Sequence, residues 1–234
     1  MKQETYGFKN INVDCMIGLP KQSFDEVKQI IEELIRLNPE HISVYSLIIE
    51  EGTRLDKMLR EKALELPCEE LERIMYWYAK KTLEANNYNH YEISNFAKKG
   101  FESKHNLDCW NQKEYIGFGV SAHSYTNQCR YSNISNIMQY ILNYKNNKQE
   151  DNIIIHEIQN KTSMAKEFIM LSLRTIQGCS KENFYKKFGY DLEKGFSNKI
   201  EKLKLQGLIE INENSIILTE KGIDYANLVW EEFV

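Results

Sequence analysis

Apolar and polar residues follow two alternating patterns through the first hundred positions. Two short runs, residues 11–17 and 41–47, are rich in β-branched and aromatic side chains, which is typical of buried strands. The apolar residues between these runs recur at intervals of three and four, as on one face of a helix: they are Phe24, Val27, Ile31, Leu34 and Ile35. The pattern predicts a strand, an amphipathic helix and a second strand.

Cap residues agree with these limits, and the pattern then repeats. Ser23 and Glu26 have the spacing of a capping box, and Asn38-Pro39 ends the helix. A second amphipathic helix is predicted at residues 69–86, followed by a strand at residues 88–96. Strands alternating with helices at this spacing predict βαβ units and a parallel sheet with the helices outside it.

Residues 97–132 break this pattern. They are rich in glycine, asparagine, histidine and aromatic residues, with short strands predicted near residues 115–118 and 122–125. A long segment of this kind inside a compact domain is usually functional. A helix at 134–144 and a polar run follow it, and we place a domain boundary between residues 155 and 156.

The last third has a different order of elements. A helix is predicted at residues 164–176, and Ser180 and Asp191 each have the position of a helix cap. Two short strands at residues 208–211 and 216–218 precede a final helix that opens at Thr219. Helices followed by a hairpin and a helix are typical of a winged-helix domain.

Composition narrows the functional classes. The chain has 234 residues, 42% of them hydrophobic, and a formal net charge of −4, which is no general signature of binding to nucleic acid or anionic membranes. No window approaches ~18 uncharged apolar residues, and the first residues lack an apolar signal core. We therefore expect a cytoplasmic protein without a membrane span.

The cysteines point away from a self-contained metal site. Five are scattered through the chain, and no two form a Cys-x-x-Cys pair: they are Cys15, Cys68, Cys109, Cys129 and Cys179. An odd, scattered set argues against a disulfide framework and against an iron-sulfur or zinc site held by this chain alone. We expect reduced thiols.

Six segments, in the same order along the chain, resemble the oxygen-independent coproporphyrinogen III oxidase-like radical SAM family. They are residues 12–20 (NVDCMIGLP), 39–47 (PEHISVYSL), 50–53 (EEGT), 91–97 (YEISNFA), 105–110 (HNLDCW) and 115–124 (YIGFGVSAHS). The largely kept His-Asn-x-x-Tyr-Trp segment makes the chain more similar to the haem chaperone branch than to the true oxidase. The resemblance covers essentially the whole chain.

The resemblance implies radical chemistry in a longer parent protein. Members of the family hold a [4Fe–4S] cluster on a Cys-x-x-x-Cys-x-x-Cys loop, and the cluster binds S-adenosylmethionine (SAM). This sequence contains no such loop. We therefore expect this chain to be the C-terminal portion of an α/β protein and to be inactive alone. We expect the later half of a partial (β/α)6 radical SAM barrel at residues 1–155 and a winged-helix-like capping domain at residues 156–234.

Three positions are implied on the SAM side. Asp14 matches a family acid that contacts the SAM ribose, which suits a carboxylate at a strand end. Ile48 matches a position that packs near the adenosine, and His123 occupies another such position, where the oxidase has an apolar residue. A predicted strand ends at Glu92, Ser94 and Asn95. We expect these side chains either to line the ligand cavity or to make loop hydrogen bonds.

Two positions are implied on the haem side. His105 is the possible axial ligand to haem iron, and the Trp110 indole can pack on a porphyrin face. Cys109 stands where the branch usually has tyrosine, and its thiolate is an alternative iron ligand. His41, His90 and His156 follow no pattern, and we expect structural roles for them.

Several alternatives stay open. The motifs do not separate haem delivery from porphyrinogen decarboxylation, and a non-enzymatic haem-binding module is a second hypothesis. A DNA-binding regulator is a third, but residues 163–234 carry ten Lys or Arg and eleven Asp or Glu, a weak phosphate surface. The strand at residues 11–17 begins so early that we expect an unpaired sheet edge, which favours dimerisation.

Overall fold

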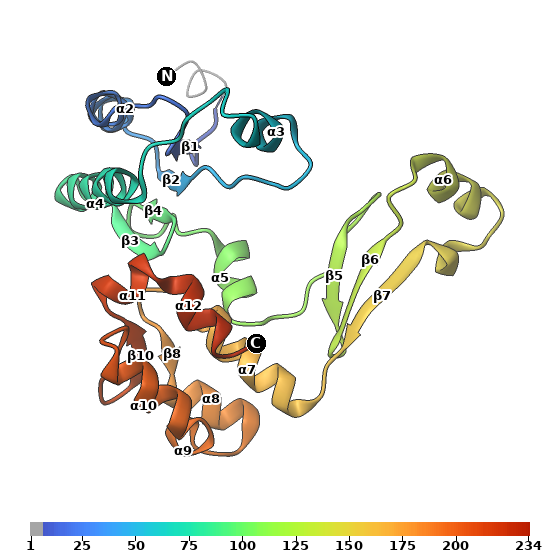
Figure 1. The fold of residues 1–234 in the computed structure, drawn as a ribbon. Helices are drawn as coiled ribbons and strands as arrows, with labels where there is room; N and C mark the ends of the chain where they lie inside the picture. Colours follow the sequence, from blue (N-terminus) through green and yellow to red (C-terminus); the bar gives the residue numbers. More distant parts are fainter. Residues whose placement is uncertain (1–6) are drawn as a thin grey trace. The chain divides into compact units, whose positions relative to one another are not determined.

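The computed structural model describes residues 7–234, which divide into two compact units at Ser103 and Lys104 (Figure 1). Each unit contains both helices and strands, so the chain has a mixed α/β fold, and the described residues form no closed barrel. No helix within residues 7–234 is long and apolar enough to cross a membrane.

The first unit is built on a four-stranded sheet in the order β1-β2-β4-β3. Its elements are β1 (Asn12–Ile17), α2 (Phe24–Leu37), β2 (His41–Ser46), α3 (Arg54–Arg60), α4 (Glu69–Ala85), β3 (Asn89–Glu92) and β4 (Asn95–Ala97). The parallel pairing of β1 with β2 confirms the predicted βαβ unit. The Ser23–Glu26 capping box of α2 is present, and Asn38 ends the helix in the left-handed conformation.

The predicted third parallel strand is wrong. Residues 88–96 form a hairpin instead, because Ile93 and Ser94 make a turn between β3 and β4. β4 pairs antiparallel with β2, and the Val44 N–H donates to the Ser94 carbonyl at 2.7 Å. The sheet is therefore mixed rather than wholly parallel.

One face of this sheet carries the core of the first unit. Strand residues such as Cys15, Ile17, Ile42, Val44 and Phe96 pack against the apolar stripes of α2 and α4. Because side chains alternate along a strand, the residues between them lie on the other face of the sheet. That second face is polar, and it carries Asp14.

The second unit contains two three-stranded sheets, ordered β5-β6-β7 and β8-β10-β9. The elements up to α7 are α5 (Lys104–Trp110), β5 (His123–Thr126), β6 (Cys129–Asn133), α6 (Ile137–Lys145), the 3-10 helix η1 (Gln149–Asn152), β7 (Ile153–Ile158) and α7 (Lys161–Ser172). The elements after α7 are β8 (Cys179–Ser180), α8 (Lys181–Phe188), α9 (Leu192–Gly195), α10 (Ser197–Leu205), β9 (Ile209–Ile211), β10 (Ser215–Leu218), α11 (Glu220–Asp224) and α12 (Ala226–Glu231).

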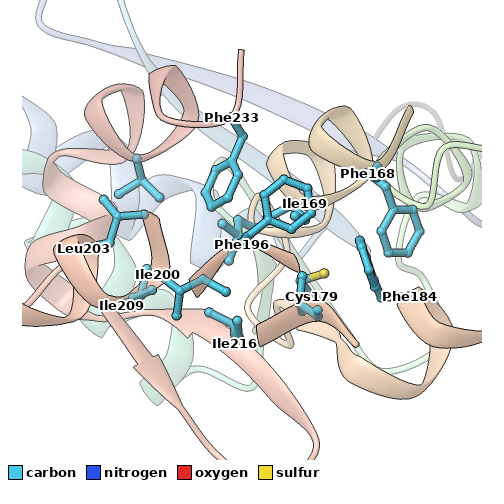
Figure 2. Close-up of a cluster of buried hydrophobic side chains, with 14 of the residues drawn as sticks. Phe168, Ile169, Cys179, Phe184, Phe196, Ile200, Leu203, Ile209, Ile216 and Phe233 are labelled. Atoms are coloured by element: carbon cyan, nitrogen blue, oxygen red, sulfur yellow. The ribbon is translucent and has the colours of Figure 1, made fainter. Parts of the chain in front are cut away.

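An aromatic-rich core holds the C-terminal elements together (Figure 2). Phe184 on α8 is fully buried, and its ring contacts those of Phe168 and Phe196. Ser180, Asp191 and Thr219 all cap helices, as the sequence predicts. The helix expected after Asp191 is split into α9 and α10 at Phe196.

The sequence did not predict β7. All six of its residues are exposed, and it pairs with β6 as the outer strand of its sheet. The boundary predicted between residues 155 and 156 falls inside this strand. The compact units divide at residue 103 instead, and the domain limits 1–155 and 156–234 stay a prediction.

Candidate functional site

A row of polar side chains crosses the face of the first sheet that α2 and α4 leave open. The strand register places Asp14 beside Ser43, Ser43 beside Asn95, and Asn95 opposite Glu92. Glu92 and Asn95 are buried, and the Asn95 amide donates to the Glu92 carboxylate. The sheet thus brings together Asp14 with two of the residues predicted to line the cavity.

Asp14 is exposed near the middle of β1. Its Oδ1 accepts a hydrogen bond from Asn12 Nδ2 at 2.6 Å. Within residues 7–234, Asp14 Oδ2 has no hydrogen-bond partner. A carboxylate held at one oxygen and open at the other is suited to accept from a ligand hydroxyl, so Asp14 fits the ribose contact that the resemblance implies.

The other two residues expected on the SAM side lie elsewhere. Ile48 is 77% exposed in the loop after β2. A shallow hollow in this unit is lined by the loop and α3 side chains of Glu51, Asp56 and Arg60, and Ile48 is not among its lining residues. His123 belongs to the second unit, at the start of β5, so the predicted set is divided between the two units.

His123 stacks on a histidine that the sequence did not connect with it. The His123 and His156 ring centroids are 5.5 Å apart, and His156 Nε2 lies 2.7 Å from Ser132 Oγ. The pair follows from the pairing of β5 with β6 and of β6 with β7, and the sequence did not predict β7. Over residues 7–234, no three His, Cys, Asp or Glu side chains come close enough together to hold a metal ion.

Helix α5 carries the residues expected on the haem side. His105 and Cys109 are four apart and share a face, with Nε2 3.9 Å from Sγ. His105 is exposed. Burial and the Asp108 carboxylate raise the pKa of the Cys109 thiol, and Arg130 only partly opposes them. The imidazole is therefore the better-prepared iron ligand of the two.

Trp110 is already engaged within the second unit. The Arg174 guanidinium lies 4.9 Å from the Trp110 ring centroid and 3.8 Å from that of Trp230. Trp110 Nε1 is buried and has no hydrogen-bond partner among the described residues. One face of the indole is thus covered by a cation.

The cysteines are free and separated. Cys15 lies in β1, Cys68 precedes α4, Cys129 lies in β6 and Cys179 lies in β8. Burial raises the pKa of Cys15 to about 11 and that of Cys179 to about 12, so both stay protonated at neutral pH. This set does not fit an iron-sulfur cluster, which needs several thiolates at one point.

Comparisons with known proteins extend these observations. Residues 159–225 match the HemN C-terminal domain. The haem chaperone HemW of Lactococcus lactis subsp. lactis (strain IL1403) is 36% identical over 228 residues, which are 97% of this chain and 59% of that protein. The haem chaperone HemW of Bacillus subtilis (strain 168) is 37% identical over 230 residues, which are 97% of this chain and 60% of that protein.

A solved structure shares the fold. Coproporphyrinogen III oxidase (HemN) from Escherichia coli, described as a radical SAM enzyme, matches with a TM-score of 0.77 at 17% identity, over 98% of this chain and 56% of that one. The chain thus spans somewhat over half the length of each of these relatives. The resemblance drawn from the six sequence segments is confirmed: part of the chain matches the HemN C-terminal domain, and nearly all of it is similar to the haem chaperone HemW.

Proposed function

We propose that this chain takes part in haem handling and binds haem iron through His105. The observation that supports this most directly is an exposed imidazole on α5, in a chain whose relatives over 97% of its length are named haem chaperones. A neutral imidazole nitrogen is a common axial ligand of haem iron. Cys109 is a secondary ligand in this proposal, because its raised thiol pKa disfavours the thiolate at neutral pH.

Trp110 is proposed as a porphyrin contact through the part of the ring that Arg174 does not cover. The indole also helps to hold α5 through the Arg174 stack. Its substitution should therefore weaken both haem affinity and folding, whereas substitution of the exposed His105 should affect haem alone.

On the SAM side, we propose that Asp14 accepts from the ribose hydroxyls and that Ile48 packs near the adenosine. The SAM-side role of His123, which lies in the second unit, stays a prediction from the resemblance. Glu92 and Asn95 lie on the same sheet face as Asp14. A [4Fe–4S] cluster, if held by a longer parent protein, would supply the electron for SAM cleavage. The cysteines of this chain do not fit such a cluster, and we propose that the chain alone does not perform that chemistry.

We propose the finer architecture on the same basis. The parallel β1–α2–β2 unit supports the later half of a partial (β/α)6 barrel. The order of helices followed by the β9–β10 hairpin supports a winged-helix-like domain, and its role as a cap of the barrel stays a prediction from the resemblance.

A DNA-binding role for this last domain is less well supported. Two lysines of α10 are used within the domain: Lys199 donates to the Glu232 carbonyl, and Lys202 pairs with the Glu232 carboxylate. A helix that reads DNA needs such cations for phosphates. Salt-sensitive binding of duplex DNA by the chain would revive this alternative.

Titration of ferric haem into the chain, followed by absorbance, tests the proposed function. We expect a ligand-bound Soret band for the wild type and at least about tenfold weaker binding for His105→Ala, the loss of one coordinate bond. His156→Ala, which removes another exposed histidine of the same unit, is the matched control and should bind normally. Equal spectra for the wild type and His105→Ala would remove His105 as the ligand.

A further inference from the structure

A continuous chain of hydrogen bonds reaches Asp14 across the open face of the first sheet. The Ser103 N–H donates to the Tyr91 hydroxyl oxygen at 3.2 Å, and that oxygen lies 2.7 Å from His41 Nε2. His41 Nδ1 lies 2.6 Å from Asn12 Oδ1, and Asn12 Nδ2 lies 2.6 Å from Asp14 Oδ1. Five residues from four segments of the protein are linked in this way: Asn12 and Asp14 from β1, His41 from β2, Tyr91 from β3, and Ser103.

The donor and acceptor groups of these residues allow the row of hydrogen bonds only one direction. A carboxylate only accepts, so the Asn12 amide nitrogen must face Asp14 and its carbonyl oxygen must face His41. That oxygen also only accepts, so His41 Nδ1 carries the proton. Nε2 of a neutral ring then accepts from the Tyr91 hydroxyl, whose oxygen accepts from Ser103. Every donor therefore points toward Asp14.

The strand register holds the central pair in place. Asn12 lies directly beside His41 in the parallel β1–β2 ladder, and the Ser43 hydroxyl gives Asn12 Oδ1 a second donor at 3.2 Å. His41 is 6% exposed, and the Tyr91 ring meets it edge-on with centroids 5.7 Å apart. The Asn12 amide thus has partners at both ends and little freedom to flip.

The charge states agree with this direction. Burial lowers the pKa of His41, although the facing carboxylates of Asp14 and Glu102 oppose that shift, so the ring is neutral at pH 7. Burial raises the pKa of Tyr91 to about 12, so its hydroxyl keeps its proton. Chains of aligned hydrogen bonds polarise one another, and this one ends at a carboxylate.

We propose that Tyr91, His41 and Asn12 are positioning residues that fix Asp14 Oδ1 and leave Oδ2 as the acceptor for the vicinal hydroxyls of a ribose-bearing ligand. The proposal deepens, and rests on, the role proposed above for Asp14. It predicts that an adenosine-type ligand is recognised through its 2′,3′-diol on this face of the sheet.

The chain of hydrogen bonds from Ser103 to Asp14 is called the relay below. The tautomer of His41 tests this relay without any ligand. Two-bond ¹H–¹⁵N NMR correlations at pH 7 should show a protonated Nδ1 and an unprotonated Nε2, the reverse of the form that a free histidine side chain prefers. Tyr91→Phe should shift the Nε2 resonance. Tyr88→Phe is the control, because that hydroxyl bonds the Pro39 carbonyl at 2.8 Å, outside the relay. A protonated Nε2, or equal shifts in the two variants, would overturn the relay.

Nucleoside binding tests the purpose of the relay. The wild type and Tyr88→Phe should prefer adenosine over 2′,3′-dideoxyadenosine by at least about tenfold, the contribution of one hydrogen bond to a charged group. Asn12→Asp should abolish this preference, since it places a second carboxylate against Asp14. His41→Asn, which keeps a donor near Nδ1, should retain more of the preference than His41→Leu.

The outcomes separate the two claims. The expected tautomer together with a diol preference that depends on Asn12 supports both. The expected tautomer with equal binding of both nucleosides, or with none, overturns the ribose role of Asp14 and leaves the relay geometry supported. A diol preference that Asn12→Asp and His41→Leu leave unchanged overturns the positioning role.

Discussion

His90 shows how burial sets the ionisation of single residues in this protein. It lies on the helix-covered face of the first sheet, stacked on Phe96 with ring centroids 4.6 Å apart. Burial lowers the pKa of His90 to about 4. The hydrogen bond to the Ile93 carbonyl raises this pKa, but its effect is smaller than that of burial. The folded protein therefore resists protonation of this ring.

This shift predicts how stability depends on pH. An unfolded histidine titrates near pH 6.5, so between about pH 6.5 and 4 the unfolded chain binds a proton that the folded chain does not. The stabilisation is complete above the unfolded pKa and declines as the pH falls toward 4, by on the order of 2–3 kcal/mol. Urea denaturation at several pH values measures this decline.

A matched pair of variants isolates the His90 contribution. His90→Gln keeps a donor near Nε2 but does not titrate, so its stability should fall less steeply between pH 6.5 and 4. His156→Gln, at an exposed position in β7, is the matched control. A His90→Gln profile parallel to that of the wild type would refute this account.

For single residues, the sequence predicts a role for Asp14, which stays a prediction, but it does not predict the residues that bond to Asp14. Asp14 stands inside a specific motif, whereas His41 was expected to be merely structural. His41 meets Asn12 and Tyr91, which are 29 and 50 positions away in sequence. Such contacts depend on strand register, which hydrophobic periodicity does not fix at the level of individual partners.

Among the elements, α2 is the one whose limits the sequence predicts best. Ser23 accepts from the Glu26 N–H at 3.2 Å, and the Glu26 carboxylate accepts from the Ser23 N–H at 2.7 Å. Ser23→Ala should therefore lower the free energy of unfolding by about 1 kcal/mol, measured by urea denaturation. Gln29→Ala, at an exposed position within α2, should change it by less than about 0.5 kcal/mol.

The missed elements have local causes. The β3–β4 hairpin turns on only Ile93 and Ser94, which carry no strong turn signal, so residues 88–96 look like one strand. β7 follows a polar run and has apolar residues on both faces, which conceals the period of two that marks a half-buried strand. In both cases the local pattern does not reveal the pairing, which is of β4 with β2 and β3, and of β7 with β6.

For the whole molecule, the open sheet edges predict self-association. β1 and β7 are outer strands of their sheets within the described residues, with Met16 37% and Ile155 60% exposed. Unpaired, partly apolar strand edges favour pairing between chains. We expect light scattering to show a mass that rises with protein concentration.

Edge-directed substitutions test this expectation. Met16→Lys or Ile155→Lys should reduce the association, because a charged side chain at the edge opposes pairing. Leu228→Lys changes an apolar residue that is 53% exposed on a helix, and it should have little effect. A mass that is the same at all concentrations in the wild type would rule out edge pairing.

We propose above that this chain, which is similar to HemN and HemW, binds haem iron through His105. Addition of imidazole to ferric haem bound by His105→Gly tests it most directly, by magnetic circular dichroism in the Soret region. We predict that imidazole restores the wild-type spectrum of this variant and leaves His156→Gly unchanged. A His105→Gly complex that has the wild-type spectrum before imidazole is added would contradict the claim.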